Sequence, residues 1–261
     1  MLTVISPAKR LNETPLQLPT GLPTTVPAFA SDALRLARIA RKLSVDQLCG
    51  LMDISVALGT LNRDRFKSFS TDAPGLPAAF LFDGDTYAGL DARGMTEDTL
   101  RWAQGHLRIL SGLYGLLRPL DTIQPYRLEM GSRLQNPKGA DLYAFWGDKI
   151  ARALNLQAAE TGAKALINCA SAEYFGAVAV NRLKLPVVTP VFLEERGNDV
   201  KVVSFWAKKA RGAISRFIAQ HQLTDPADLH GFTDGGYAHR PDLSVPGRLV
   251  FLRRAADQIA A

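Results

Sequence analysis

Short apolar runs that end abruptly in turn-forming or polar residues are the feature of this sequence that most restricts its fold. The first run, LTVI at residues 2–5, stops at Ser6 and Pro7. Runs of this length, bounded by Gly, Pro or polar residues, are typical of buried strands. Between them lie amphipathic helical patterns such as residues 33–43. Further strands are expected at KALINCA (164–170), PVVTPVFLE (186–194), DVKVVSF (199–205) and GRLVFL (247–252).

This mixture of strands and helices predicts an α/β (mixed α+β) fold around a mixed β-sheet. The chain of 261 residues contains no internal repeat and no linker-like segment, so we expect one domain over residues 1–261. Helices are expected at 146–159 and 204–220, and Ser31 or Asp32 is expected to cap an earlier helix.

The composition is that of a globular protein with a moderate excess of basic residues. Hydrophobic residues make up 47% of the chain, and 31 Lys and Arg against 25 Asp and Glu give a net charge of +6. The two cysteines, Cys49 and Cys169, lack CxxC spacing, which favours reduced thiols. With no signal-peptide pattern and no run of about 20 apolar residues, we expect a cytoplasmic protein without a membrane partner. We also expect it to be a monomer.

The segment SFWAKKARGAISRFI, residues 204–218, predicts an amphipathic helix whose polar side is entirely basic. On a helical wheel, Trp206 belongs to an apolar stripe that faces the core. No Asp or Glu occurs between residues 199 and 225, so the basic side either meets solvent or binds an anion. Gly212 costs about 0.5–1 kcal/mol relative to Ala, and we expect it to let a bound group come close. The basic side carries Lys208, Lys209, Arg211 and Arg216.

Polar residues also gather where elements end. Ser6 and Lys9 follow the first strand, and Ser171 and Glu173 follow the strand at 164–170. Open sheets present ligand-binding groups at such strand ends. Asp148 and Lys149 lie at a helix start, where Asp148 suits the positive end of the helix dipole and Lys149 would rather bind an anion. Each pair has an ordinary reading as loop or capping residues, but their coincidence predicts an anion-binding cleft.

Common enzyme signatures are missing from the sequence: it has no GxSxG, GxGxxG, Walker A or HExxH motif. The four histidines are scattered, and the spacing of His230 and His239 with Asp234 and Asp242 matches no standard metal site. We therefore predict no metal and no cofactor.

The segment GLYGLLRPLDTIQPYRLEMGSRL, residues 112–134, combines glycines, prolines and arginines. Its first part, with the residues before it, predicts a strand, a turn and then the start of a helix. A glycine-rich turn with exposed backbone amides is also how helix-hairpin-helix modules hold a nucleic-acid phosphate. The basic residues of the segment are Arg118, Arg127 and Arg133.

Six segments together carry a family resemblance. They are ISPAKRLNE, FDGDTYAGLDA, LYGLLRPLDTIQPYRLEMGSRL, FWGDKI, CASAEYF and VSFWAKKARGAISRFI, in order from residue 5 to residue 218. The sequence resembles the YaaA (DUF328, UPF0246) family of bacterial peroxide-stress proteins. Two departures stand out: Ala172 replaces a usual asparagine, and GLYG is one residue longer than a standard Gly-apolar-Gly hairpin turn.

The resemblance implies an α/β fold with a positively charged cleft and a helix-hairpin-helix-like element. It also implies DNA binding and protection from hydrogen peroxide through a limit on free intracellular iron. Our first hypothesis is a binder of double-stranded DNA with weak sequence preference, acting in oxidative-stress defence without a known catalytic activity. The residues expected to contact phosphates are Lys9, Arg118, Arg127, Arg133, Lys149, Lys208, Lys209, Arg211 and Arg216.

The alternative hypothesis is an enzyme that acts on a nucleotide-like or phosphorylated small molecule in the same cleft. Glu173 would be its general base, and lysines would neutralise phosphate charge. A direct iron sequestrant ranks last, because the sequence has no paired metal-ligand motif. The residues that would line the enzyme's pocket are Ser6, Lys9, Asp148, Lys149, Glu173 and Lys208.

Overall fold

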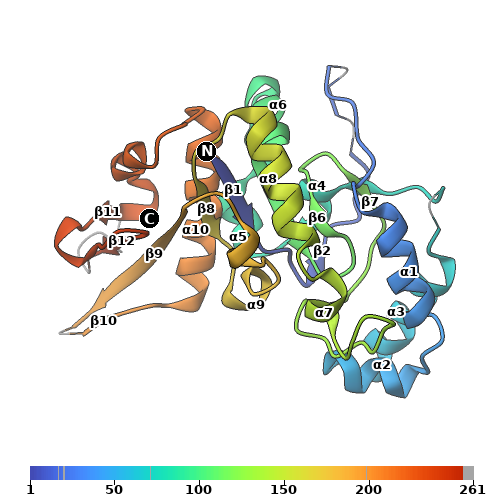
Figure 1. Ribbon diagram of the computed structural model, residues 1–261. Coiled ribbons are helices and arrows are strands. Elements are labelled where there is room, and N and C mark those ends of the chain that lie inside the picture. Colours follow the sequence, from blue (N-terminus) through green and yellow to red (C-terminus); the bar gives the residue numbers. More distant parts are fainter. Residues whose placement is uncertain (17, 20, 71, 198, 255–261) are drawn as a thin grey trace.

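The computed structural model describes residues 1–16, 18, 19, 21–70, 72–197 and 199–254, and an 8-stranded mixed β-sheet lies at its centre (Figure 1). Its strands are β1 (Leu2–Ile5), β5 (Leu107–Ser111), β6 (Gly115–Leu117), β8 (Leu166–Cys169), β9 (Val187–Arg196), β10 (Asp199–Lys201), β11 (Tyr237–His239) and β12 (Arg248–Arg253). The order is β11-β12-β9-β8-β1-β5-β6, with β10 paired to β9 beside this path. Strands β12, β9, β8, β1 and β5 run parallel, whereas β11, β10 and β6 are antiparallel to their neighbours. The predicted mixed sheet is confirmed.

Two short strand pairs and several helices surround this sheet. The pairs are β2 (Arg10–Leu11) with β4 (Phe82–Asp83), and β3 (Leu76–Pro77) with β7 (Thr122–Ile123). The α-helices are α1 (Ala30–Ala40), α2 (Val45–Met52), α3 (Val56–Ser68), α4 (Ala78–Leu81), α5 (Asp85–Leu90), α6 (Glu97–His106), α7 (Leu142–Trp146), α8 (Lys149–Thr161), α9 (Ala172–Phe175) and α10 (Ser204–Gln220). Short 3-10 helices are η1 (Ala92–Gly94), η2 (Val180–Arg182), η3 (Pro226–Gly231), η4 (Asp234–Gly236) and η5 (Pro241–Leu243).

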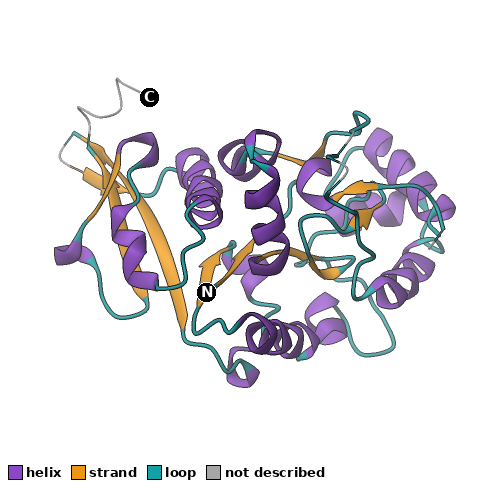
Figure 2. Cartoon of the chain, turned by 90° about the horizontal axis from the view of Figure 1, so that it is seen from above, coloured by secondary structure: helices purple, strands orange, loops and turns teal. Residues whose placement is uncertain are grey.

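Helices cover both faces of the central strands. Helix α10 lies on one face and α8 on the other, while α1, α2 and α3 gather at one end of the molecule (Figures 1 and 2). Apolar side chains from Met1 to Phe251 form one continuous hydrophobic cluster between these layers. The helices leave the two ends of the parallel strands uncovered, and loops lie there. We call the side where the parallel strands begin the amino edge and the side where they end the carboxyl edge.

The segment after β5 turns back as a strand instead of starting a helix. Gly115 has a φ of 69°, in the left-handed region that glycine adopts without strain, and the ring of Trp146 packs against it. The chain therefore reverses and β6 pairs antiparallel with β5. The expected helix start was wrong here, and so was a continuous helix over 146–159, because Gly147 with a φ of 52° separates α7 from α8.

No helix-hairpin-helix element forms at Gly112 to Gly115. Residues 112–134 contain no helix, and these glycines lie in the turn of the β5–β6 hairpin. A Cβ on Gly112 would stand 2.3 Å from the carbonyl oxygen of Leu128, so this glycine lets residues 126–131 cross the end of β5 at close range. The predicted position of the element was wrong for this segment.

Helix α10 confirms the predicted apolar stripe but not the predicted role of Gly212. Ala207, Ala210 and Ile214 are buried, whereas Trp206, which was predicted to face the core, is only partly buried. Gly212 is buried as well, and a Cβ there would stand 1.8 Å from the carbonyl oxygen of Thr86 in α5. A Cβ on Gly89 of α5 would likewise meet the backbone of Lys209 at 1.9 Å. The two glycines therefore let the helix backbones touch, and Gly212 admits α5, not a ligand.

The N-cap of helix α1 lies two or three residues before the expected Ser31 or Asp32. Phe29 is the N-cap residue and provides no side-chain hydrogen bond, so Asp32 lies in the first helical turn. The Asp32 carboxylate is instead buried, and its Oδ2 accepts a hydrogen bond from Lys149 Nζ at 2.6 Å. The capping prediction was wrong, and Asp32 ties α1 to the start of α8.

Candidate functional site

The order of the strands creates a switch point between β1 and β8. From β1 the chain crosses to β5 on one side and later returns to β8 on the other side of β1. Open sheets of this kind bind ligands outside the carboxyl ends of the strands at such a point. Ser6 follows β1 and Ser171 follows β8, and the Ser171 backbone N–H donates to Ser6 Oγ at 2.9 Å. Two of the segments predicted to carry polar site residues therefore meet here.

Buried tyrosines pack beneath this edge of the sheet, and two of them form hydrogen bonds with residues at the strand ends. Tyr87 donates its hydroxyl to the backbone carbonyl of Ser6 at 3.1 Å, and the Tyr126 hydroxyl lies 2.6 Å from Ser111 Oγ at the end of β5. Burial raises the pKa of Tyr87 well above its usual value and does the same to the pKa of Tyr174. These phenols therefore stay neutral and keep their protons at physiological pH.

Residues 126–131 bring charge to the same place. Lys9 Nζ and Arg127 Nη2 approach a single oxygen, Glu129 Oε1, at 3.0 and 3.3 Å. Arg127 Nε is buried and has no hydrogen-bond partner in the described part of the chain. These side chains line a small pocket with Pro7, Ala8, Phe82, Tyr126, Leu128 and Tyr174.

Glu173 holds the crossing segment to the end of β8. Its Oε1 accepts a hydrogen bond from the Gly131 N–H at 2.9 Å. Ser171 caps α9 by accepting a hydrogen bond from the Tyr174 N–H, so it has the ordinary capping role that the sequence also allowed. Ala172 is the exposed first residue of α9. Glu173 therefore has a clear positioning role for the loop that carries Arg127 and Glu129.

The starts of α8 and α10 lie toward this carboxyl edge. The amino group of Met1 at the head of β1 contacts the carbonyl of Thr224 at 3.5 Å, so α10 ends at the opposite, amino edge. Trp146, just before α8, donates its indole N–H to the carbonyl of Gly112 at 3.0 Å. Because helix N-termini carry partial positive charge, both helices add to a positive potential at the carboxyl edge.

The predicted phosphate-contacting residues divide into paired and unpaired groups. Lys9 and Arg127 share Glu129, while Lys149 pairs with Asp32, Arg216 with Asp91 and Arg118 with Asp121. Arg118 follows β6, which is antiparallel to β5, so it lies at the amino edge and not at the carboxyl edge with Lys9 and Arg127. The predicted residues that make no ion pair within the described ranges are Arg133, Lys208, Lys209 and Arg211.

Asp148 serves its own helix. It is the N-cap residue of α8 but gives no side-chain cap, and its carboxylate pairs with Arg152. The hydrogen bond from Arg152 lowers the pKa of Asp148, which keeps the carboxylate ionised. The Asp148 carboxylate is therefore engaged in an ion pair with its own helix on the surface of α8.

Sequence reasoning missed the carboxylates that partner the basic residues. Glu129, Asp32 and Asp91 were not among the predicted site residues. One signal was available for Glu129: residues two apart in an extended chain point to the same side, as Arg127 and Glu129 do. Asp32 and Asp91 lie far from Lys149 and Arg216 in sequence, and no local pattern predicts those pairs.

Cys169 is shielded although it lies beside this edge. The thiol is buried at the end of β8, and burial raises the pKa of Cys169 to about 12. Since the thiolate is the form that reacts with peroxides, Cys169 is not poised to react with hydrogen peroxide.

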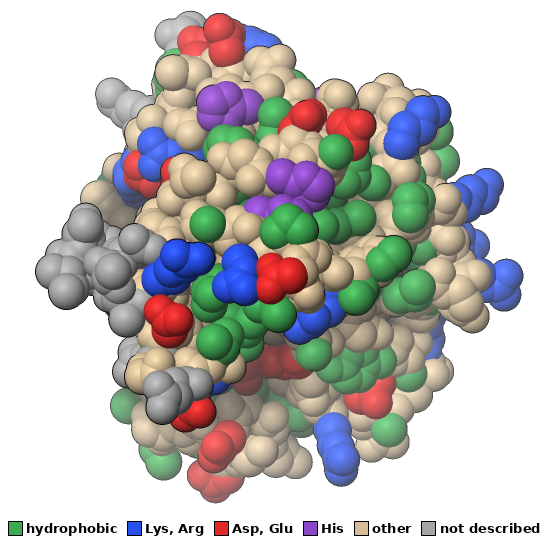
Figure 3. Space-filling view, turned by 90° about the vertical axis from the view of Figure 1, so that its left-hand side faces the viewer, with side chains coloured by type: hydrophobic (Ala, Val, Ile, Leu, Met, Phe, Trp, Pro, Cys, Tyr) green, Lys and Arg blue, Asp and Glu red, His purple; other side chains and the backbone are tan. Residues whose placement is uncertain are grey.

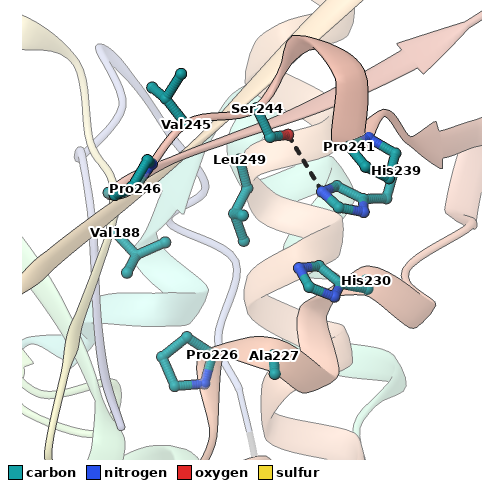
Figure 4. A pocket seen from close by; sticks show the side chains of 11 residues that line it. Val188, Pro226, Ala227, His230, His239, Pro241, Ser244, Val245, Pro246 and Leu249 are labelled. Carbon is teal, nitrogen blue, oxygen red and sulfur yellow. Dashed lines mark hydrogen bonds between the residues drawn. The ribbon is translucent and has the colours of Figure 1, made fainter.

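A second cavity lies at the β9–β12 end of the molecule. Figure 3 shows this end, where histidines neighbour hydrophobic side chains. His230 and His239 stack with ring centroids 4.0 Å apart and planes 9° apart, and His239 Nε2 contacts Ser244 Oγ at 3.2 Å (Figure 4). In parallel stacked rings the nitrogen lone pairs do not converge on one point. Asp242 is engaged by Arg240, and the described residues contain no group of three or more His, Cys, Asp or Glu able to hold a metal ion.

None of the helices in the described ranges combines the length and apolar character needed to cross a bilayer.

The family model of the peroxide stress protein YaaA matches residues 1–243. A UPF0246 protein of Cereibacter sphaeroides strain ATCC 17025 is 58% identical over 257 residues, covering 98% of this chain and 100% of that protein. UPF0246 proteins of Jannaschia sp. and Ruegeria pomeroyi are each 56% identical, over 262 and 257 residues, covering 100% and 97% of this chain and 100% and 98% of those proteins. With a family match over most of its length and relatives aligned along nearly all of it, the chain belongs to the YaaA family of peroxide stress proteins.

Proposed function

We propose that this peroxide-stress protein binds double-stranded DNA through backbone phosphates, with weak sequence preference, at the carboxyl edge of its sheet. The observation that carries this proposal is the start of α10. Lys208 and Lys209 are exposed there and make no ion pair with any described residue. No Asp or Glu occurs between residues 199 and 225 to balance them. Two exposed, unbalanced cations in one helical turn favour a polyanion as partner.

The surroundings of these lysines support the same partner. The N-cap position of α10 is Val203, which offers no side-chain acceptor to the first backbone N–H groups of the helix. Such N–H groups and the helix dipole favour phosphate oxygens. Phe205, 50% exposed beside the lysines, offers an apolar surface to sugar or base edges. Phosphate contacts carry no sequence information, so weak sequence preference follows.

The proposed test measures how duplex affinity depends on salt. We expect the double variant Lys208→Ala, Lys209→Ala to bind a random-sequence duplex more weakly and to reduce the slope of log affinity against log salt by about two units, since each phosphate contact contributes about 0.9. Fluorescence anisotropy at several salt concentrations measures both quantities.

The matched control removes two lysines from the other edge. Lys164 and Lys184 are exposed and precede β8 and β9, so they lie at the amino edge. The variant Lys164→Ala, Lys184→Ala lowers the net charge equally and is expected to keep most of the slope. Equal losses in both variants, or a slope near zero for the unmodified protein, would contradict the proposal.

We further propose that DNA binding limits oxidative DNA damage and that the limit on free iron is an indirect effect. Cells carrying the Lys208→Ala, Lys209→Ala variant are then expected to lose peroxide resistance together with duplex affinity. Full resistance in these cells, at normal protein levels, would separate the stress role from DNA binding.

The second candidate function is an enzyme acting on a phosphorylated or nucleotide-like small molecule. The contact between Ser6 and Ser171 at the switch point favours it, because that is where open sheets bind small ligands. Glu173→Gln distinguishes the two functions: loss of peroxide resistance with unchanged duplex affinity would favour the enzyme.

A further inference from the structure

Two cations share one carboxylate oxygen in the pocket at the end of β1. Lys9 Nζ and Arg127 Nη2 lie 3.0 and 3.3 Å from Glu129 Oε1. Lys9 comes from the loop after β1, whereas Arg127 and Glu129 come from the segment that crosses the end of β5. One negative charge thus faces two positive charges, and the group retains a formal charge of +1.

The guanidinium of Arg127 is only partly satisfied by this arrangement. Its Nε is buried without a hydrogen-bond partner in the described part of the chain, while Nη2 makes a long contact to Glu129. The Nε–Nη2 edge of an arginine binds two oxygens of a carboxylate or phosphate in parallel. A buried donor without an acceptor is unfavourable. An anion that offered two oxygens to this edge would therefore bind it better than Glu129 does.

The pocket has no room for such an anion while Glu129 occupies it. Its free volume is about 10 Å³, which is close to the space of one water molecule. The side chain of Lys9 is 69% exposed, so it can move into solvent, and that of Glu129 is 18% exposed at the pocket opening. Movement of these two side chains would enlarge the pocket, whose other lining residues include the buried Phe82, Tyr126 and Tyr174.

We propose that this pocket is a phosphate subsite and that the Glu129 carboxylate occupies the place of the ligand's phosphate group. The ligand's phosphate displaces Glu129, takes both Nε and Nη2 of Arg127, and pairs with Lys9. The inference rests on the proposed function, because it assigns one phosphate position within the carboxyl edge. A phosphodiester of duplex DNA and a free phosphate group share the required chemistry, and the test separates them.

The test compares three variants with two probes, a random-sequence duplex and inorganic phosphate, by anisotropy and calorimetry. Glu129→Gln removes the competing charge and is expected to strengthen binding by about tenfold. Glu97→Gln, the control, removes the same charge from the exposed Glu97–Arg101 pair on α6 and is expected to change affinity less than about twofold. Adding Arg127→Lys to Glu129→Gln keeps the charge but removes the two-donor edge, so most of the gain is expected to disappear.

Each outcome has a distinct meaning. A gain for duplex assigns the subsite to DNA, and a gain confined to inorganic phosphate assigns it to a free phosphate group. Glu129→Gln affinities equal to those of Glu97→Gln on both probes overturn the subsite, even if the unmodified protein binds duplex with the expected salt dependence. If the unmodified protein does not bind duplex but Glu129→Gln gains affinity for inorganic phosphate, the proposed DNA function fails and the subsite stands.

Discussion

Replacing Glu194 with alanine is expected to lower the free energy of unfolding by about 3–5 kcal/mol. The Arg253 guanidinium donates to Glu194 Oε2 through both Nε at 2.9 Å and Nη2 at 2.8 Å, and Tyr237 donates its hydroxyl to Oε1. Both charged side chains are almost completely buried, with Glu194 at 0% and Arg253 at 2% exposure. Without Glu194, a buried guanidinium keeps its charge but loses its counter-ion. Urea denaturation followed by circular dichroism measures the change.

This loss would be large against a typical total stability of about 5–15 kcal/mol. Arg253 also stacks 4.1 Å from the ring of Trp206, so the pair fastens the start of α10 to β9 and β12. Glu97→Ala at the exposed Arg101 pair is the control, with an expected loss under about 1 kcal/mol. Similar losses of unfolding free energy for the two variants would show that the buried pair contributes no more to stability than the exposed pair. Replacing both Glu194 and Arg253 with apolar residues is expected to cost much less than Glu194→Ala alone.

Gly212→Val is expected to destabilise the protein by about 3 kcal/mol or more, at the upper end of overpacking effects. A Cβ at this position would stand 1.8 Å from the carbonyl oxygen of Thr86 and 2.6 Å from the backbone nitrogen of Leu90. Both atoms belong to helix backbone, so no side-chain rotation relieves the clash and α5 has to move. Thermal or urea unfolding of the variant measures the effect.

Gly50→Ala provides the matched control in another helix. Gly50 lies inside α2, and a Cβ there would meet nothing within 4 Å. Its replacement is expected to stabilise the protein by about 0.5–1 kcal/mol through helix propensity alone. Unchanged stability of Gly212→Val with lost duplex affinity would contradict the packing role and restore the ligand-approach reading of this glycine.

The sequence predicts the parts of the site that depend on local pattern. The apolar run at residues 2–5 and the run at 164–170 form neighbouring parallel strands, so the polar residues after them, Ser6 and Ser171, meet as expected. The basic side of residues 204–218 was visible on the helical wheel, and Lys208 and Lys209 are indeed exposed. The periodicity of the apolar residues and the turn-forming residues that bound each run were sufficient to predict these features.

Contacts between distant segments were beyond such reasoning. Lys149 and Asp32 are 117 residues apart, and Arg216 and Asp91 are 125 apart, so their pairing depends on tertiary packing. Gly212 shows the same limit: a helix-interior glycine admits either a ligand or another helix, and only the position of α5 decides between them. The strand order that creates the switch point is likewise a property of the whole fold.

Lysine footprinting tests most directly the claim that the carboxyl edge of the sheet is the surface that binds DNA. The protein is acetylated briefly with and without a random-sequence duplex, and modified peptides are quantified by mass spectrometry. We predict that duplex protects Lys208 and Lys209, while Lys164 and Lys184 at the amino edge react equally in both samples. Protection of Lys164 and Lys184 with full reactivity of Lys208 and Lys209 would contradict the account.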